Sequence, residues 1–163
     1  MDADTMTAAS AVAIAIGALV VSVVQTRAIM LHNRQSVRPI LQIRRNRKYD
    51  SPGAGLRIIN SGPGPAVITK TIVMFDGQVV GPWDRESVRS ITDGMPHKPQ
   101  LNSLDGAVLG PGYDGYLLRL DSYEREEHGW FWELISERLQ LTVHYESLYG
   151  GEDYVVIKRT ARA

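Results

Sequence analysis

The hydrophobic and polar positions divide the chain into one continuous apolar run and a longer stretch of short apolar runs separated by turns. Residues 5–26 contain no charged side chain and are mostly Ala, Val, Ile and Leu. A helix of this length covers roughly 30 Å at about 1.5 Å per residue, which matches the hydrocarbon core of a bilayer. The pattern therefore predicts a transmembrane anchor near the N-terminus.

The apolar run continues into a polar segment that contains no Gly or Pro before Pro39. Because the residue before a proline is pushed out of the α region, the helix should end near Val37 or Arg38. We therefore expect two parts, an anchor with a juxtamembrane helix over residues 1–38 and a single β-rich domain over residues 39–163.

The basic residues nearest to the apolar run all follow it, namely Arg27, Arg34 and Arg38. Lys and Arg close to a span favour the cytoplasmic side, which predicts a single-pass protein of the inner (cytoplasmic) membrane with its N-terminus outside and its C-terminal domain in the cytoplasm. A cleaved signal peptide is the alternative. The acidic start at Asp2 and Asp4 argues against it, since signal peptides open with a basic region.

Small residues within the apolar run share one helix face. Ala9, Ala13 and Gly17 are spaced four apart, a pattern that lets a second helix approach closely. This stripe predicts a homo-oligomer formed through the transmembrane helix. The competing explanation is that small residues recur by chance in an alanine-rich span.

The remaining residues show short β-type runs bounded by Gly and Pro. The predicted strands are 39–44, 56–60, 66–75, 78–80, 113–120, 139–146 and 154–158. Two helices are expected at 83–91 and 123–137, with an irregular excursion over 93–106. Residues 139–146 alternate cleanly between apolar and polar positions, which indicates a strand with one buried face.

These runs predict a mainly β fold, in which an antiparallel immunoglobulin-like β-sandwich with one or two connecting helices follows the N-terminal helix. The phrases LRIINSGPGPA at 56–66 and LGPG at 109–112 have the strand-turn-strand form of such domains. With HNR at 32–34, VRP at 37–39 and YESLYG at 145–150, the chain resembles small bacterial single-pass membrane proteins of unknown function. The resemblance implies architecture and no activity.

A basic cluster follows the juxtamembrane helix and is the strongest candidate for lipid or partner contact. Its members are Arg38, Arg44, Arg45, Arg47 and Lys48. Anionic lipid is one ligand for such a cluster, and a solvated strand end is the simpler explanation. An upright helix would hold the cluster about 20 Å above the headgroups, beyond the Debye length of ~8 Å, so lipid contact needs a tilted or bent helix.

The sequence contains no recognisable catalytic or cofactor-binding motif. There is no cysteine, no Gly-x-Ser-x-Gly and no P-loop, and the four histidines include no pair at i, i+4. We accordingly predict a protein that is not an enzyme, with no catalytic residue, no cofactor and no metal. Sixteen of the eighteen acidic residues and eleven of the eighteen basic residues follow Lys48, so the acidic domain argues against a nucleic-acid partner.

An anchor joined to a domain without evident chemistry favours a membrane-anchored interaction or scaffold module with an unidentified protein partner. Its recognition surface is expected in the excursion at 93–106. The first alternative is an assembly device that binds anionic lipid and oligomerises through its helix. The second is an enzyme with a site built across loops.

Overall fold

The computed structural model describes residues 2–47 and 53–160. Its contacts separate two units, the first ending at Ser36 and the second beginning at Val37. The first unit is a single helix, α1 (Ala3–Ser36), whose described side chains are all exposed. Its portion Met6–Ser36 is long and apolar enough to cross a membrane. A signal sequence can have the same length and composition. The predicted N-terminal apolar helix is confirmed.

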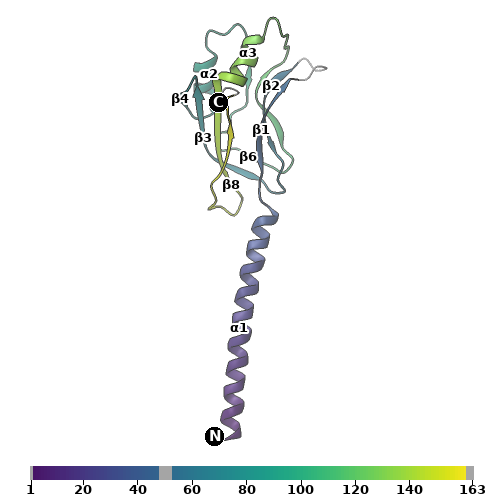
Figure 1. Cartoon of the computed structure of the whole chain (residues 1–163), viewed down its shortest axis with the longest axis vertical. Helices are drawn as coiled ribbons and strands as arrows, with labels where there is room; N and C mark the ends of the chain where they lie inside the picture. The colour runs from purple at the N-terminus through teal and green to yellow at the C-terminus, as the bar shows by residue number, and fades with distance from the viewer. Residues whose placement is uncertain (1, 48–52, 161–163) are drawn as a thin grey trace. The chain divides into compact units, whose positions relative to one another are not determined.

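The second unit contains two antiparallel sheets, which Figure 1 shows as facing layers. The first sheet has the strand order β1 (Leu41–Arg47), β2 (Ala54–Asn60), β7 (Asp114–Leu120), β5 (Gln100–Leu101). The second has the order β4 (Gln78–Gly81), β3 (Ala66–Phe75), β8 (Leu139–Glu146), β9 (Tyr154–Lys158), with β6 (Val108–Leu109) paired to β3. The expected antiparallel, sandwich-like arrangement is confirmed.

Apolar side chains from both sheets form one core. In β8 the buried and half-buried positions alternate along the whole strand, as its sequence predicts. Leu56 and Ile58 of β2 contribute from the other sheet, and Trp83 and Phe131 enter from the connections. Removal of this apolar surface from water, at roughly 25 cal/mol per Å², is the main force that holds the sheets together.

The two strands at the centre of the second sheet have the predicted bounds, and so does β9. The first strand does not, because β1 begins at Leu41 rather than at residue 39. Pro39 has no N–H to donate, and the N–H of Ile40 donates instead to the side chain of Asn60 at 3.2 Å. The excursion at 93–106 also differs from expectation, since it contributes the short strand β5.

The first helix of the domain agrees with the sequence. Helix α2 (Arg85–Thr92) begins after Asp84, whose Oδ1 accepts a hydrogen bond from the N–H of Ser87 at 2.8 Å. Its buried side chains include Val88 and Ile91, which lie three residues apart on one face of the helix.

The single helix predicted at 123–137 is wrong. The structure has a short helix, α3 (Gly129–Glu133), followed by a π-helical turn, η1 (Leu134–Arg138). The ring of the buried His128 accepts the N–H of Glu124 at 3.0 Å, and the N–H of His128 donates to the carbonyl of Glu124 at 2.8 Å. These bonds close a local turn before Gly129, so the helix begins only there. Phe131 of α3 is fully buried.

Asn60, at the end of β2, connects three segments at one end of the domain. Its buried side chain takes part in five hydrogen bonds. Its Oδ1 accepts from the N–H groups of Ile40 and Gly62, and its Nδ2 donates to the carbonyls of Gly64, Leu109 and Gly110. The segment that leads from α1 into β1 is thereby fixed to two turns of the domain.

Candidate functional site

A concavity of the domain lies where the pairing of β3 is interrupted on one side. Along its other side β3 pairs continuously with β8, apart from a bulge between Ile68 and Lys70. On the interrupted side, β6 pairs with residues 66–67 and β4 with residues 73–75. In the part of the chain that the structure describes, no strand lies beside residues 69–72 on this side. We call this opening the β3 gap.

Local conformation explains why β4 ends before the gap. The turn residues Asp76 and Gly77 both have positive φ, 48° and 81°, as a two-residue hairpin loop requires. The returning strand β4 ends at Gly81, whose φ is 157°. A Cβ at that position would lie 2.5 Å from the Oγ of Ser87, so glycine allows the chain to pass close to α2 as it leaves the sheet.

The opposite end of the gap is closed by the segment that enters β6. The N–H of Ile68 donates to the carbonyl of Ala107 at 3.0 Å. The preceding Gly106 has a φ of 61°, a conformation that glycine adopts without strain. The gap is therefore bounded by Gly81 at one end and Ala107 at the other.

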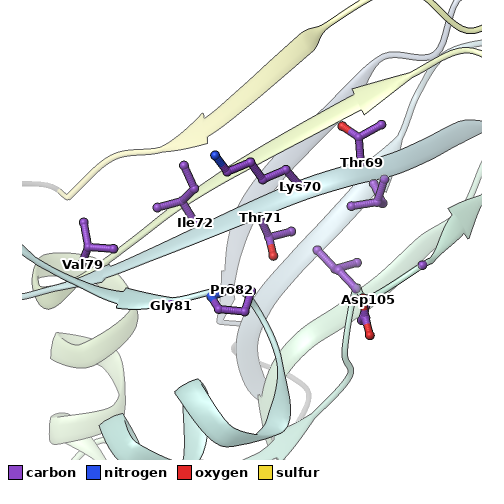
Figure 2. Close-up of a pocket in the computed structure, with 11 residues that line it drawn as sticks. Thr69, Lys70, Thr71, Ile72, Val79, Gly81, Pro82 and Asp105 are labelled. Carbon is purple, nitrogen blue, oxygen red and sulfur yellow. The ribbon is translucent and has the colours of Figure 1, made fainter.

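A cleft of about 580 Å³ opens onto the β3 gap. This volume lies within the range of protein ligand pockets. In Figure 2 the side chains of Lys70, Ile72 and Val79 lie on one side of the β3 ribbon, and those of Thr71, Pro82 and Asp105 lie on the other. The full lining is Ile68, Thr69, Lys70, Thr71, Ile72, Val79, Gly81, Pro82, Leu104, Asp105 and Gly106.

The floor of the cleft is held by hydrogen bonds from Trp83. Its N–H donates to the Oγ1 of Thr71 at 2.7 Å, and its indole Nε1 donates to the carbonyl of Asn102 at 2.9 Å. The ring itself is buried in the core. Because Trp83 is fixed at both its backbone and its ring, it anchors the adjoining Gly81 and Pro82, which line the cleft.

Two charged side chains of opposite sign line the cleft, Lys70 and Asp105. Both are exposed, and among the described residues neither forms an ion pair. They give the cleft a positive and a negative end around an apolar wall that includes Ile72 and Val79. Such a surface is suited to binding a partly apolar, partly charged ligand.

The structure separates the members of the predicted basic cluster. Arg44 lies on the same face of β1 as Gln42, whose Oε1 accepts from its Nε at 3.0 Å. Arg45 and Arg47 alternate with Arg44 along the strand, and the guanidinium of Arg47 lies 4.9 Å from the ring centroid of Trp132. Lys48 lies outside the described residues.

Arg38, the remaining member of that cluster, stacks over the ring of Tyr154 at 4.9 Å from its centroid. The cation therefore lies against β9. The stripe of Ala9, Ala13 and Gly17 is exposed on α1, and a Cβ at Gly17 would meet no atom within 4 Å. Helix association through that stripe stays a prediction.

A second group of polar side chains, His97, Glu127 and His128, was not anticipated from the sequence, which predicted no metal site. One ligand atom from each lies within 4.8 Å of the other two, as a metal site would require. The Nε2 of His97 is 3.9 Å from the Oε1 of Glu127, and the two imidazole rings meet edge to face at 4.9 Å.

The hydrogen bonding of His128 argues against a metal ion at this cluster. Its Nδ1 accepts the N–H of Glu124, so the neutral ring carries its proton on Nε2. A metal ion would have to displace either that amide or that proton. We therefore assign His128 to holding the turn before α3.

The residues of the cleft carry little local signal, because the gap arises from where β4 leaves β3 and where the chain returns at Ala107. The sequence did place Leu104, Asp105 and Gly106 in the excursion expected to form a recognition surface. Comparisons of the chain with protein-family models, curated proteins and solved structures give no significant match.

Proposed function

We propose that this chain is a membrane-anchored, non-enzymatic interaction module that binds a partner protein in the cleft beside the β3 gap. The observation that carries the proposal is a strand edge interrupted within a sheet and opening into a cleft with an apolar wall and two charges of opposite sign. The long apolar helix supports the membrane anchor.

In this proposal the module works by localisation. A tether confines the domain to a thin layer at the membrane and raises its effective concentration toward partners in the same layer. The arginines after the apolar run support a cytoplasmic position for the domain, with the N-terminus outside the inner membrane. The stripe of small residues supports helix association, and the facing antiparallel sheets support the immunoglobulin-like assignment.

The anionic-lipid alternative has weaker support. Alternation along β1 directs Arg44 and Arg45 to opposite faces, and Arg47 stacks on Trp132. A lipid surface would be expected to attract arginines that share one face. The cleft, by contrast, brings apolar and charged side chains to a single opening beside β3.

The proposal is tested with the full chain in the membranes of cells that contain its natural partners. A photo-crosslinking amino acid is placed at Val79, on the cleft and 67% exposed, or at Val155, on β9 and 44% exposed, as the matched control. We expect a discrete crosslinked partner from Val79 only, and its loss when Ile72→Arg is added. Equal products from both positions, or none from Val79, would overturn the proposal.

The predicted orientation is tested separately with reporters fused after Ala163. A reporter active only in the cytoplasm should be active there, and one that needs export should be silent. The reverse result would place the domain outside and would refute a cytoplasmic partner.

A further inference from the structure

We propose that the β3 gap is filled by a short extended peptide segment of the partner, which pairs with β3 as an added strand between β4 and β6. This inference rests on the proposed function and specifies what the cleft binds. Addition of a strand to an open sheet edge is a general mode of peptide recognition, in which main-chain hydrogen bonds supply affinity and side-chain pockets supply specificity.

The first step is the direction of the backbone groups at the gap. Phe75 and Gln78 flank the two-residue turn, and this pair exchanges hydrogen bonds in such hairpins. The N–H and C=O of Phe75 therefore point toward β4. Backbone groups alternate sides along a strand, so those of Val73 and Thr71 point the same way. β4 no longer pairs with β3 at Thr71. The N–H and C=O of Thr71 therefore face the cleft.

The other end of β3 gives the same assignment independently. The N–H of Ile68 points away from β8, because it donates to Ala107. The register then shifts between Ile68 and Lys70, leaving Thr69 as the extra residue of a bulge. The backbone N–H and C=O of Lys70 therefore point toward β8, and those of Thr71 point away from β8. Both ends of the strand thus direct the Thr71 peptide groups into the cleft.

The dimensions of the gap limit the length of the segment that can pair. Residues 69–72 extend over about 13 Å at about 3.3 Å per residue. The chain at Gly81 and at Ala107 closes the two ends, so about three partner residues can lie flat against β3 before the segment must leave through the open side of the cleft. The neighbouring strands β4 and β6 run antiparallel to β3, and we assign the same direction to the added segment.

The side chains around the gap specify the chemistry of the segment. Ile72 and Val79 form an apolar wall on one side of β3, adjacent to Lys70 (Figure 2). Asp105 lies on the other side of the strand. The matching segment carries an apolar side chain toward Ile72 and Val79, an acidic residue toward Lys70 and a basic residue toward Asp105. A small molecule could fill the cleft, but it would not reproduce strand pairing at Thr71.

The test begins with hydrogen exchange measured by NMR on the full chain in nanodiscs. In the unbound chain the amide of Thr71 should exchange at least tenfold faster than that of Ile72, whose N–H points toward β8. A library of random linear decapeptides displayed on phage is then selected against the same sample. We expect selected peptides with an apolar and an acidic residue two positions apart and a basic residue between them, because side chains alternate faces along an extended segment. Binding of one such peptide should slow exchange at Thr71 at least tenfold.

Variants locate the binding site. Val79→Arg should weaken the selected peptide at least tenfold, whereas Val155→Arg should leave its dissociation constant within twofold of the parent value. Tryptophan fluorescence of each variant establishes that the domain is folded, since Trp83, Trp130 and Trp132 all lie within it. If Val79→Arg does not fold, Val79→Lys replaces it as the same test.

Several results would overturn the inference. They are protection of the Thr71 amide in the unbound chain, failure of any peptide to be enriched, and binding that leaves Thr71 exchange unchanged. The crosslinking experiment separates this failure from that of the proposed function. A partner crosslinked at Val79, together with unchanged Thr71 exchange on its binding, would retain the docking cleft and reject strand addition.

Discussion

Lys158, the last residue of β9, is a buried cation whose cost to stability can be measured. It is 5% exposed, and its Nζ donates to the backbone carbonyl of Leu139. Burial, followed by the nearby positive charge of Arg45, lowers the pKa of Lys158 from its usual 10.5 to about 8. The folded domain therefore disfavours the ammonium form that the unfolded chain carries at neutral pH.

The sign and size of the effect follow from that pKa. Between about pH 8 and pH 10.5 the unfolded chain binds a proton that the folded chain has lost, so the free energy of unfolding rises with pH across this window. The full shift corresponds to about 3 kcal/mol at neutral pH. Lys158→Met also removes the hydrogen bond to the carbonyl of Leu139, which offsets part of this gain, so we expect the variant to stabilise the domain by about 2 kcal/mol at pH 7.

The assay is urea unfolding of the full chain in mild detergent, followed by tryptophan fluorescence from pH 7 to pH 9.5. The parent chain should gain about 1 kcal/mol or more over this range, and the advantage of Lys158→Met should shrink correspondingly. Lys70→Met is the matched control, because the Lys70 side chain is exposed on β3 and should show neither effect. A Lys158→Met variant that is less stable than the parent at pH 7 would refute the reasoning.

Three further substitutions test contacts that position the turns of the domain. Asn60→Ala leaves five hydrogen-bonding groups without their partner and should lower the free energy of unfolding by about 3 kcal/mol or more, measured by urea denaturation. Gly64→Ala would place a Cβ 1.7 Å from the carbonyl oxygen of Val37, so we expect a lower yield of folded protein and altered amide shifts at residues 37–40. Asp76→Asn keeps a residue that tolerates positive φ but removes the ion pair with Arg138, which lowers the pKa of Asp76. The cost should be less than about 1 kcal/mol at neutral pH and should vanish as the pH falls below the usual carboxylate range, because the contribution of this carboxylate is lost on protonation.

The elements that sequence predicted well are those whose pattern is local. The alternation over 139–146 predicted β8 residue by residue, and the hairpin between β3 and β4 turns between the predicted strands 66–75 and 78–80. Helix α2 covers most of the range predicted for it, 83–91. In each case a few consecutive residues determine the conformation, so no distant contact is needed to make the prediction.

The features that the sequence did not predict depend on contacts between distant residues or on side-chain bonds that compete with a helix. Apolarity alone would place Val155 and Ile157 inward, yet the register with β8 leaves both exposed and turns Lys158 inward. The ring of His128 competes with helical bonding before Gly129. The cleft depends on where β4 ends and where the chain returns at Ala107, two positions that no local pattern connects.

The way in which the other sheet edges are protected supports the proposal that the β3 gap binds a partner. Exposed strand edges invite unwanted pairing, and proteins protect them with short strands and with inward-pointing or flanking charges. Three of the described edge strands follow this rule: β5 covers just Gln100–Leu101, β9 turns Lys158 inward, and β1 carries Arg44 and Arg45. The gap has the charge of Lys70, but it also opens onto a cleft with an apolar wall. If the β3 gap is only a protected edge, the Val79→Arg variant should fold and function normally. If the gap binds a partner, the same variant should fold but no longer bind that partner, and this contrast distinguishes the two roles.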